Sequence, residues 1–140
     1  ARQHAEILFI VSAGNNGRNI DKRPLFPASL TLDNILVVTS SDDFGRLAFS
    51  SNWGAESVDL MVPGEQIKII DHRGAKGRAS GASFAAPRVA ALAARLLAQN
   101  PSQTMTELKA AILQLATKPR IRGQNPVKAG WIPNPTDHSR

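Results

Sequence analysis

Cysteine and tyrosine are absent from the 140-residue sequence, and tryptophan occurs only twice. Without cysteine, the chain has neither disulfide bonds nor thiolate metal ligands, although this absence leaves the cellular compartment undecided. Long hydrophobic runs are also lacking, because no stretch approaches the roughly 20 apolar residues that a transmembrane helix needs. The sequence therefore predicts no membrane partner.

Acidic residues are outnumbered, 11 against 17 basic ones, so the formal net charge is +6 and the sequence pI is about 10.5. Such a balance raises the question of nucleic acid binding. The basic residues that we considered are Arg18, Lys22 and Arg23; Lys68, Arg73, Lys76 and Arg78; and Lys118, Arg120, Arg122 and Lys128. They lie in separate loops and form no helical stripe, and few aromatic residues accompany them. We therefore predict a solvated basic surface and no nucleic acid partner.

Apolar segments alternate with helical patterns along the chain, as in an α/β protein with a mostly parallel sheet. We expect strands at residues 7–12, 35–40, 58–62 and 67–70. The segment 84–98 is apolar almost all round, which predicts a helix that is buried on most sides.

A second helix, with a packing role only, is predicted after Thr104. Thr104 and Glu107 match the pattern of a capping box. Apolar residues then repeat at helical spacing on one face, namely Met105, Leu108, Ile112 and Leu115.

The chain is of single-domain size, with 42% hydrophobic residues. From residue 119 to 140 it becomes basic, proline-rich and aperiodic, which predicts a surface tail beyond a body formed by residues 1–118. Trp131 and Ile132 are expected to anchor one turn of this tail to the body.

Ser83 lies between small residues at the start of the predicted helix. Residues 81–82 and 85–86 leave space around its hydroxyl, and Pro87 is tolerated only in a first turn, so we expect the helix to begin at or just after Ser83. Free backbone N–H groups and the positive end of the helix dipole then converge beside the hydroxyl, as a nucleophile requires. Serine is also a preferred N-cap residue, so a purely structural role stays open at this point.

Asn15 offers the complementary half of an acyl-transfer site. A buried strand that ends at Val11 leads into the loop 12–17, where an asparagine amide can donate to a developing oxyanion. Ordinary turn chemistry is the alternative for Asn15 and Asn16, because asparagine tolerates left-handed backbone. The same loop lacks the Gly-x-Gly-x-x-Gly spacing of dinucleotide-binding proteins.

Together, these segments resemble the subtilisin-like serine proteases. Residues 12–17, Ser-Ala-Gly-Asn-Asn-Gly, are similar to the oxyanion-asparagine loop of that family, and residues 81–87, Gly-Ala-Ser-Phe-Ala-Ala-Pro, to its nucleophile motif. Three segments between them agree in the same order, namely Phe26-Pro27-Ala28, Phe49-Ser50-Ser51-Asn52-Trp53-Gly54 and Asp59-Leu60-Met61-Val62-Pro63-Gly64.

The resemblance implies the C-terminal half of a three-layer α/β fold with a mostly parallel sheet. It implies serine endopeptidase chemistry, with Ser83 as nucleophile and with Asn15 and the Ser83 N–H stabilising the oxyanion. One wall of the specificity pocket would be formed by Ser12, Ala13 and Gly14, and the other by Leu25, Phe26 and Pro27. A cis peptide bond is expected between Phe26 and Pro27.

The triad histidine and aspartate of the family precede the oxyanion loop, and we find no match for them here. The histidines, His4, His72 and His138, lack the small-residue context of a catalytic histidine and are expected at the surface. We therefore expect a polypeptide substrate, an upstream half of the same catalytic domain as partner, and a chain that is a fragment or a processed product. A catalytically inactive, subtilase-like binding module is the alternative.

The chemistry of the family requires no cofactor. Structural calcium is compatible with the resemblance, and Asp42, Asp43 and Asp59 are the candidate ligands. The resemblance also favours a secreted or periplasmic location. Among the departures from the family motif, Arg88 is expected to bind a neighbouring carboxylate.

Overall fold

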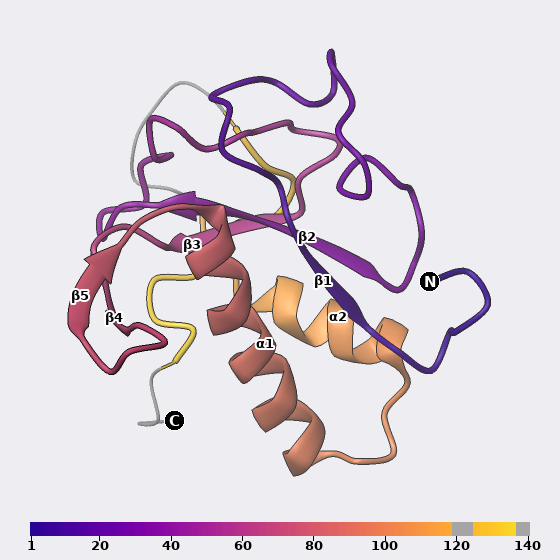
Figure 1. Ribbon diagram of the computed structural model, residues 1–140. Coiled ribbons are helices and arrows are strands. Elements are labelled where there is room, and N and C mark those ends of the chain that lie inside the picture. Colours follow the sequence, from indigo (N-terminus) through magenta and orange to yellow (C-terminus); the bar gives the residue numbers. More distant parts are fainter. Residues whose placement is uncertain (119–124, 137–140) are drawn as a thin grey trace.

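A parallel sheet forms the centre of the protein in a computed structural model, which describes residues 1–118 and 125–136 (Figure 1). Its strands are β1 (Phe9–Ser12), β2 (Ile35–Ser41), β3 (Leu60–Pro63) and β6 (Gly130–Trp131), in this order across the sheet. All three neighbouring pairs are parallel. The predicted mostly parallel α/β fold is confirmed.

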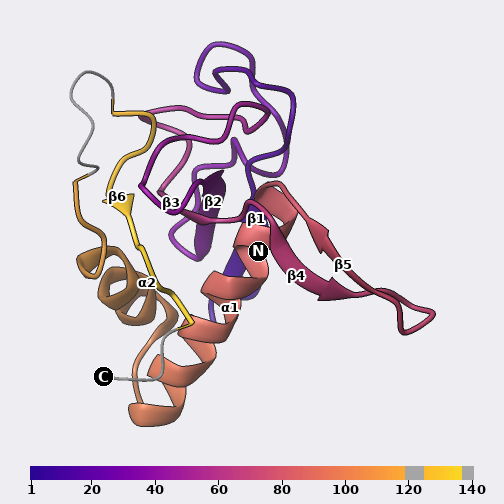
Figure 2. The same ribbon diagram turned by 90° about the vertical axis from the view of Figure 1, so that its left-hand side faces the viewer.

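A separate two-stranded antiparallel hairpin joins β4 (Ile67–Ile70) to β5 (Lys76–Ala79). It extends away from the body and leads directly into the first helix (Figure 2). The sequence predicted β4 but not β5, because Lys-Gly-Arg-Ala contains no β-branched or aromatic residue. Pairing with β4, rather than intrinsic propensity, makes this segment a strand.

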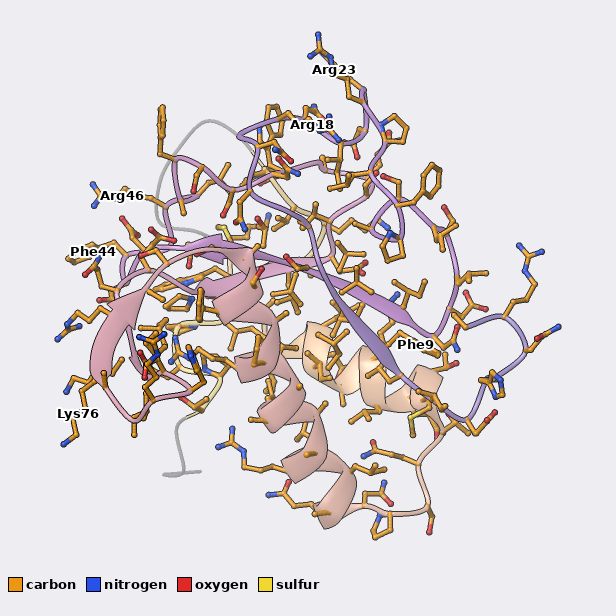
Figure 3. The ribbon with its side chains drawn as sticks, in the orientation of Figure 1. Phe9, Arg18, Arg23, Phe44, Arg46 and Lys76 are labelled. Atoms are coloured by element: carbon orange, nitrogen blue, oxygen red, sulfur yellow. The ribbon has the colours of Figure 1, made fainter. Side chains whose placement is uncertain are left out.

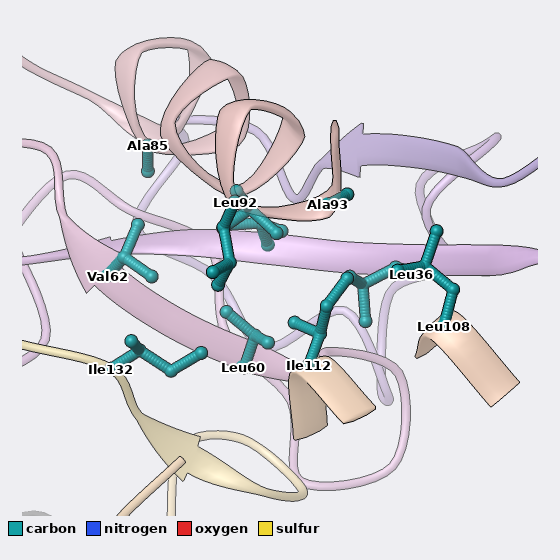
Figure 4. Packing of buried hydrophobic residues seen from close by; sticks show 11 residues of the cluster. Leu36, Leu60, Val62, Ala85, Leu92, Ala93, Leu108, Ile112 and Ile132 are labelled. Carbon is teal, nitrogen blue, oxygen red and sulfur yellow. The ribbon is translucent and has the colours of Figure 1, made fainter. Parts of the chain in front are cut away.

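Two helices, α1 (Ala82–Gln99) and α2 (Met105–Gln114), cover one face of the sheet (Figure 1). Apolar side chains from β2 and β3 meet those of both helices in a buried cluster (Figure 4). The members of this first core are Leu36, Val38, Leu60, Val62, Ala85, Val89, Leu92, Ala93, Leu108, Ile112 and Ile132. Neither of these helices is long and apolar enough to cross a membrane, which holds for the described part of the chain.

Loops rather than helices cover the opposite face of the sheet in the described ranges (Figure 1). The connections 13–34 and 42–59 pack there with residues near the C-terminus. This second core contains Ala13, Ile20, Ala28, Ile35, Val37, Val58, Met61, Val127 and Trp131. The side chains of β2 therefore alternate between two cores, which explains why all of its residues are buried.

The prediction that the first helix is buried on most sides is wrong. Helix α1 buries one stripe against the sheet and exposes another made of small residues, namely Pro87, Ala90, Ala91, Ala94 and Ala98. Alanine counts as apolar in the pattern, yet it has too little surface to require burial. The apolar pattern therefore does not by itself show which side of the helix this chain covers.

Helix α2 begins with the predicted capping box. The Thr104 hydroxyl accepts a hydrogen bond from the Glu107 N–H, and the Glu107 carboxylate accepts one from the Thr104 N–H. These Thr104 hydrogen bonds lower the pKa of Glu107, so the cap is intact at neutral pH. Leu115 was expected on the packed face, but it follows the last helical residue and is 46% exposed.

The C-terminal segment joins the body more closely than a surface tail would. The predicted anchoring is confirmed, because Trp131 and Ile132 are buried. Residues 130–131 also add β6 to the sheet beside β3, so the segment is not aperiodic throughout. A two-residue strand carries no periodic signal that a sequence can show. The proposed division of the chain at residue 118 stays a prediction.

Asp59, directly before β3, is a buried carboxylate at the junction of sheet, helix and C-terminal segment. Its Oδ2 atom accepts a hydrogen bond of 2.8 Å from the Val37 N–H. The ammonium groups of Lys109, on α2, and Lys128 lie 3.7 and 3.6 Å from its two oxygens. Asp59 therefore joins three segments that are distant in the sequence.

Replacement of this carboxylate should destabilise the protein. Asp59→Ala leaves the buried Val37 N–H without an acceptor and leaves two cations uncompensated, so we expect the free energy of unfolding to fall by about 2–3 kcal/mol. Urea denaturation of the full-length protein measures this loss. The matched control is Asp33→Ala, which removes a carboxylate at an exposed position. A change in its free energy of unfolding above about 0.5 kcal/mol would show that loss of charge, rather than loss of a buried carboxylate, causes the effect.

Candidate active site

Ser83 lies in the first turn of α1, and its side chain is exposed. Gly81 is the N-cap, with φ of 130°, so the interpretation of Ser83 as an N-cap is wrong. The helix begins one residue before Ser83, and Pro87 lies in its second turn rather than its first. Pro87 has no N–H to donate to the Ser83 carbonyl four residues earlier.

Asn15 lies beside this helix start, 67 residues away in the sequence. Its Oδ1 atom accepts a hydrogen bond of 2.9 Å from the Ala82 N–H. A Cβ atom at Gly81 would lie only 3.0 Å from the same oxygen, so the absence of a side chain at Gly81 allows this approach. The amide of Asn15 thus accepts a hydrogen bond from one of the N–H groups that have no partner inside the helix at its start.

Two hydrogen-bond donors at this helix start lack a partner among the described residues. Because the Asn15 carbonyl oxygen is occupied, the Nδ2 group is the free end of that amide, and no acceptor for it occurs among residues 1–118 and 125–136. The Ser83 N–H likewise has no partner in that part of the chain. Unpaired N–H donors can stabilise an oxyanion, and this role for Asn15 and the Ser83 N–H stays a prediction.

Gly64, just after β3, fixes the distance between the sheet and the helix start. Its carbonyl accepts a hydrogen bond of 2.9 Å from the Gly81 N–H. A Cβ atom at Gly64 would lie 2.6 Å from the Ser40 Oγ and 3.0 Å from the Ala85 Cβ. Backbone therefore packs directly on backbone at this point.

Asn52 holds the loop that carries Asn15, a role that was not predicted from the sequence. Its side chain is fully buried. The Oδ1 atom accepts hydrogen bonds from the N–H groups of Asn16 (2.9 Å) and Arg18 (3.1 Å), and Nδ2 donates to the Ala13 carbonyl (2.8 Å). The asparagine belongs to the family-like segment 49–54, which pointed to its importance. Its hydrogen-bond partners could not be predicted, because they lie 34 to 39 residues away in the sequence.

The residues predicted to form the specificity pocket lie close to this loop. A Cβ atom at Gly14 would lie 2.8 Å from the Leu25 side chain, so the two predicted walls touch there. Ser12 is half-buried, whereas Ala13 is fully buried in the second core. Phe26 and Pro27 are exposed, and the expected cis peptide bond between them is confirmed. Substrate binding by these six residues stays a prediction.

Neither histidine in the described part of the chain pairs with Ser83. His4 is exposed and its Nδ1 atom lies 3.0 Å from the Glu6 carboxylate, and His72 is exposed in the turn between β4 and β5. Both lie at the surface, as expected, and His138 lies outside the described residues.

Two of the three candidate calcium ligands, Asp42 and Asp59, are already engaged by protein groups, whereas Asp43 is exposed. Asp42 accepts hydrogen bonds from Phe44 and Arg46, and Asp59 is bound as described above. Residues 1–118 and 125–136 bring no three acidic, histidine or cysteine side chains into a cluster suited to a metal ion. Structural calcium therefore stays an untested prediction.

Arg88 follows the nucleophile motif on α1. Its guanidinium donates hydrogen bonds to the Pro63 carbonyl (2.6 Å) and the Thr136 hydroxyl (3.2 Å), both neutral oxygens. Burial lowers the pKa of Arg88, and the charge of Asp43 partly offsets this shift. Arg88 therefore makes no hydrogen bond to a carboxylate among the described residues, contrary to expectation. The carboxylate of Asp43 affects it only through its charge.

Comparison with known proteins identifies the family of this chain. A family model described as "Subtilase family" matches residues 1–131. Alkaline serine exoprotease A of Vibrio alginolyticus is 35% identical over 115 residues, which are 82% of this chain and 21% of that protein. A thermostable alkaline protease of Halalkalibacterium halodurans is 31% identical over 130 residues, which are 91% and 34% of the two chains.

Solved structures show the same likeness. The prenylagaramide maturation protease PagA superposes with a TM-score of 0.77 and 30% identity, over 93% of this chain and 49% of that one. A cold-adapted subtilisin-like serine proteinase gives a TM-score of 0.77 and 27% identity, over 89% and 44%. The chain belongs to the subtilase family, as the sequence motifs indicated. It spans less than half the length of each of these four proteins.

Loss of the Asn52 amide should destabilise the oxyanion loop. Asn52→Leu leaves the N–H groups of Asn16 and Arg18 and the carbonyl of Ala13 without their partner, so we expect the free energy of unfolding to fall by about 3 kcal/mol. Thermal or urea unfolding of the full-length protein gives this value. Asn16→Ala removes only an exposed side chain and should leave stability within about 0.5 kcal/mol. Similar losses in both variants would contradict the role assigned to Asn52.

Proposed function

We propose that this chain supplies the nucleophile and the oxyanion hole of a serine endopeptidase. One observation carries the proposal: the Ala82 N–H, directly before Ser83, binds the oxygen of the Asn15 amide, and the Asn15 Nδ2 group and the Ser83 N–H lack partners among the described residues. The similarity to named proteases supports the same chemistry.

In the proposed reaction, the Ser83 Oγ attacks the carbonyl carbon of a peptide bond. The carbonyl oxygen becomes negatively charged and accepts hydrogen bonds from Asn15 Nδ2 and the Ser83 N–H. A general base takes the hydroxyl proton of Ser83 and passes it to the amine, so that collapse of this intermediate releases the neutral amine and leaves an ester on Ser83, which water then hydrolyses. Positive charge at the start of α1 favours the anionic intermediate.

A general base for this step is proposed to come from an upstream half of the same catalytic domain. Two features of the described chain support such a partner. Strand β1 is the end strand of the sheet, with half-buried residues, and α1 exposes its stripe of small residues. An unpaired strand edge and a smooth helix face can both be covered by another part of the same fold.

A catalytically inactive, subtilase-like binding module is the second candidate. The observation that favours it is the surface position of both described histidines, which leaves Ser83 without a base in this part of the chain. The two candidates differ in one property, namely the reactivity of the Ser83 hydroxyl in the full-length protein.

Labelling with a fluorophosphonate separates these candidates. An activated serine reacts stoichiometrically with this probe, so the full-length protein should be labelled at Ser83, as mass spectrometry of the labelled peptide would show. The isolated 140 residues should react much more slowly, because they lack the base, and Ser83→Ala should abolish labelling. An unlabelled full-length protein that is folded would favour the binding module.

The role of Asn15 predicts a specific kinetic effect. In the full-length protein, Asn15→Leu should lower kcat with little change in KM, because the donor acts only as charge develops. Removal of one oxyanion donor costs about 10²–10³ in kcat in a related subtilisin, and we carry this magnitude over. Asn15→Asp, which keeps the oxygen that accepts from Ala82 but loses the donor, should also be impaired.

Asn16 provides the matched control for this measurement. Its side chain is exposed, and only its backbone N–H is used in the loop. Asn16→Ala should therefore change kcat by less than about tenfold. Equal losses at both positions, or a loss confined to Asn16, would require a different assignment of the oxyanion hole.

A further inference from the structure

The hairpin β4–β5 gathers positive charge on one of its faces. Its register places Lys68 opposite Arg78 and Ile70 opposite Lys76. Alternate residues of a strand point to the same side, so these four side chains share one face. We call the three cations Lys68, Lys76 and Arg78 the basic face.

The basic face is turned to solvent. All three of its residues are exposed, whereas Ile67, Ile69 and Ala79 on the opposite face are half-buried. The hairpin stands away from the body in Figure 2, and the Lys76 side chain points outward in Figure 3. Ile70, which lies among the cations, is 69% exposed.

Among the described residues, no carboxylate forms an ion pair with these cations. The Oδ1 atom of Asp71 accepts hydrogen bonds from the N–H groups of Arg73 and Ala75 within the turn. The Glu65 carboxylate accepts a hydrogen bond of 2.8 Å from the Ser40 hydroxyl. Within residues 1–118 and 125–136, the ion pairs of the protein lie elsewhere, and the Arg78 guanidinium donates to the Gln66 carbonyl instead.

Like charges that face each other across a strand pair destabilise a hairpin. Lys68 and Arg78 are in this position, and no ion pair among the described residues compensates for their charges. A negatively charged ligand on this face would relieve the repulsion, and Ile70 adds an exposed apolar surface to it. The charge pattern is therefore complementary to an acidic chain.

We infer that the basic face binds an acidic segment of the polypeptide substrate. This inference rests on the proposed function, because β5 leads through residues 80–82 directly to Ser83. Lys76 precedes Ser83 by seven residues, and an extended chain of that length spans at most about 25 Å. The acidic side chains should thus lie within about seven residues of the bond that is cleaved.

A binding measurement that does not depend on catalysis tests this inference. The full-length protein with Ser83→Ala is titrated into two fluorescent peptides of the same sequence, except that every glutamate of one is glutamine in the other. We expect about tenfold tighter binding of the acidic peptide at low salt. The difference should vanish at high salt, where the Debye length falls from ~10 Å to ~3 Å.

Charge reversal locates the effect. Lys68→Glu with Lys76→Glu should abolish the preference for the acidic peptide, whereas Arg2→Glu with Lys118→Glu, at exposed positions with the same change in net charge, should retain it. Equal binding of both peptides, a preference that survives in the hairpin variant, or equal loss in the control would overturn the inference. Tighter binding of a single-stranded oligonucleotide than of the acidic peptide at this face would overturn it as well.

The outcome is distinct from that of the proposed function. A full-length protein that binds the acidic peptide through the hairpin but does not react with fluorophosphonate would refute the protease and leave the binding face. A reactive protein without a preference for the acidic peptide would refute the binding face alone.

Discussion

The hydrogen bond between the Asn15 side chain and the Ala82 N–H determines the geometry of the candidate active site. It joins the loop after β1 to the start of α1, and it occupies the oxygen end of the Asn15 amide. Both partners depend on other contacts. Asn52 holds the loop by three hydrogen bonds, and Gly81 is close to the amide because it has no side chain. A local change in either segment would thus alter the same pair of donors.

The sheet serves as the common support of both segments. Parallel strands β1 and β3 end at the same edge, so the loop after β1 and the residues after β3 meet there. Helix α1 returns from this edge across the first core and is packed on β1, β2 and β3. Asp59 connects the sheet to Lys109 on α2 and to Lys128 near the C-terminus. The positions of Asn15 and Ser83 therefore depend on long-range packing rather than on their own turns.

The sequence was informative where local chemistry decides the structure. Ser83 and Asn15 were recognised because small residues, a proline and a short apolar strand surround them, and the capping box of α2 requires only four neighbouring residues. Strand β5, strand β6 and the partners of Asn52 could not be derived in this way, because each is defined by pairing with a distant segment. The stripe of alanines on α1 shows the opposite error, since apolar composition alone does not say which side is covered.

The contact between Gly64 and Gly81 has a consequence for the precision of the site. A side chain that separates two elements transmits its own choice of rotamers to their spacing. Here the Gly81 N–H bonds directly to the Gly64 carbonyl, and the neighbouring Ser40 and Ala85 leave no room for a Cβ atom at Gly64. The distance from the end of β3 to the turn that carries Ser83 is thus set by a contact between backbone groups. Changes of side-chain rotamer at Gly64 and Gly81 cannot alter this distance, because neither residue has a side chain.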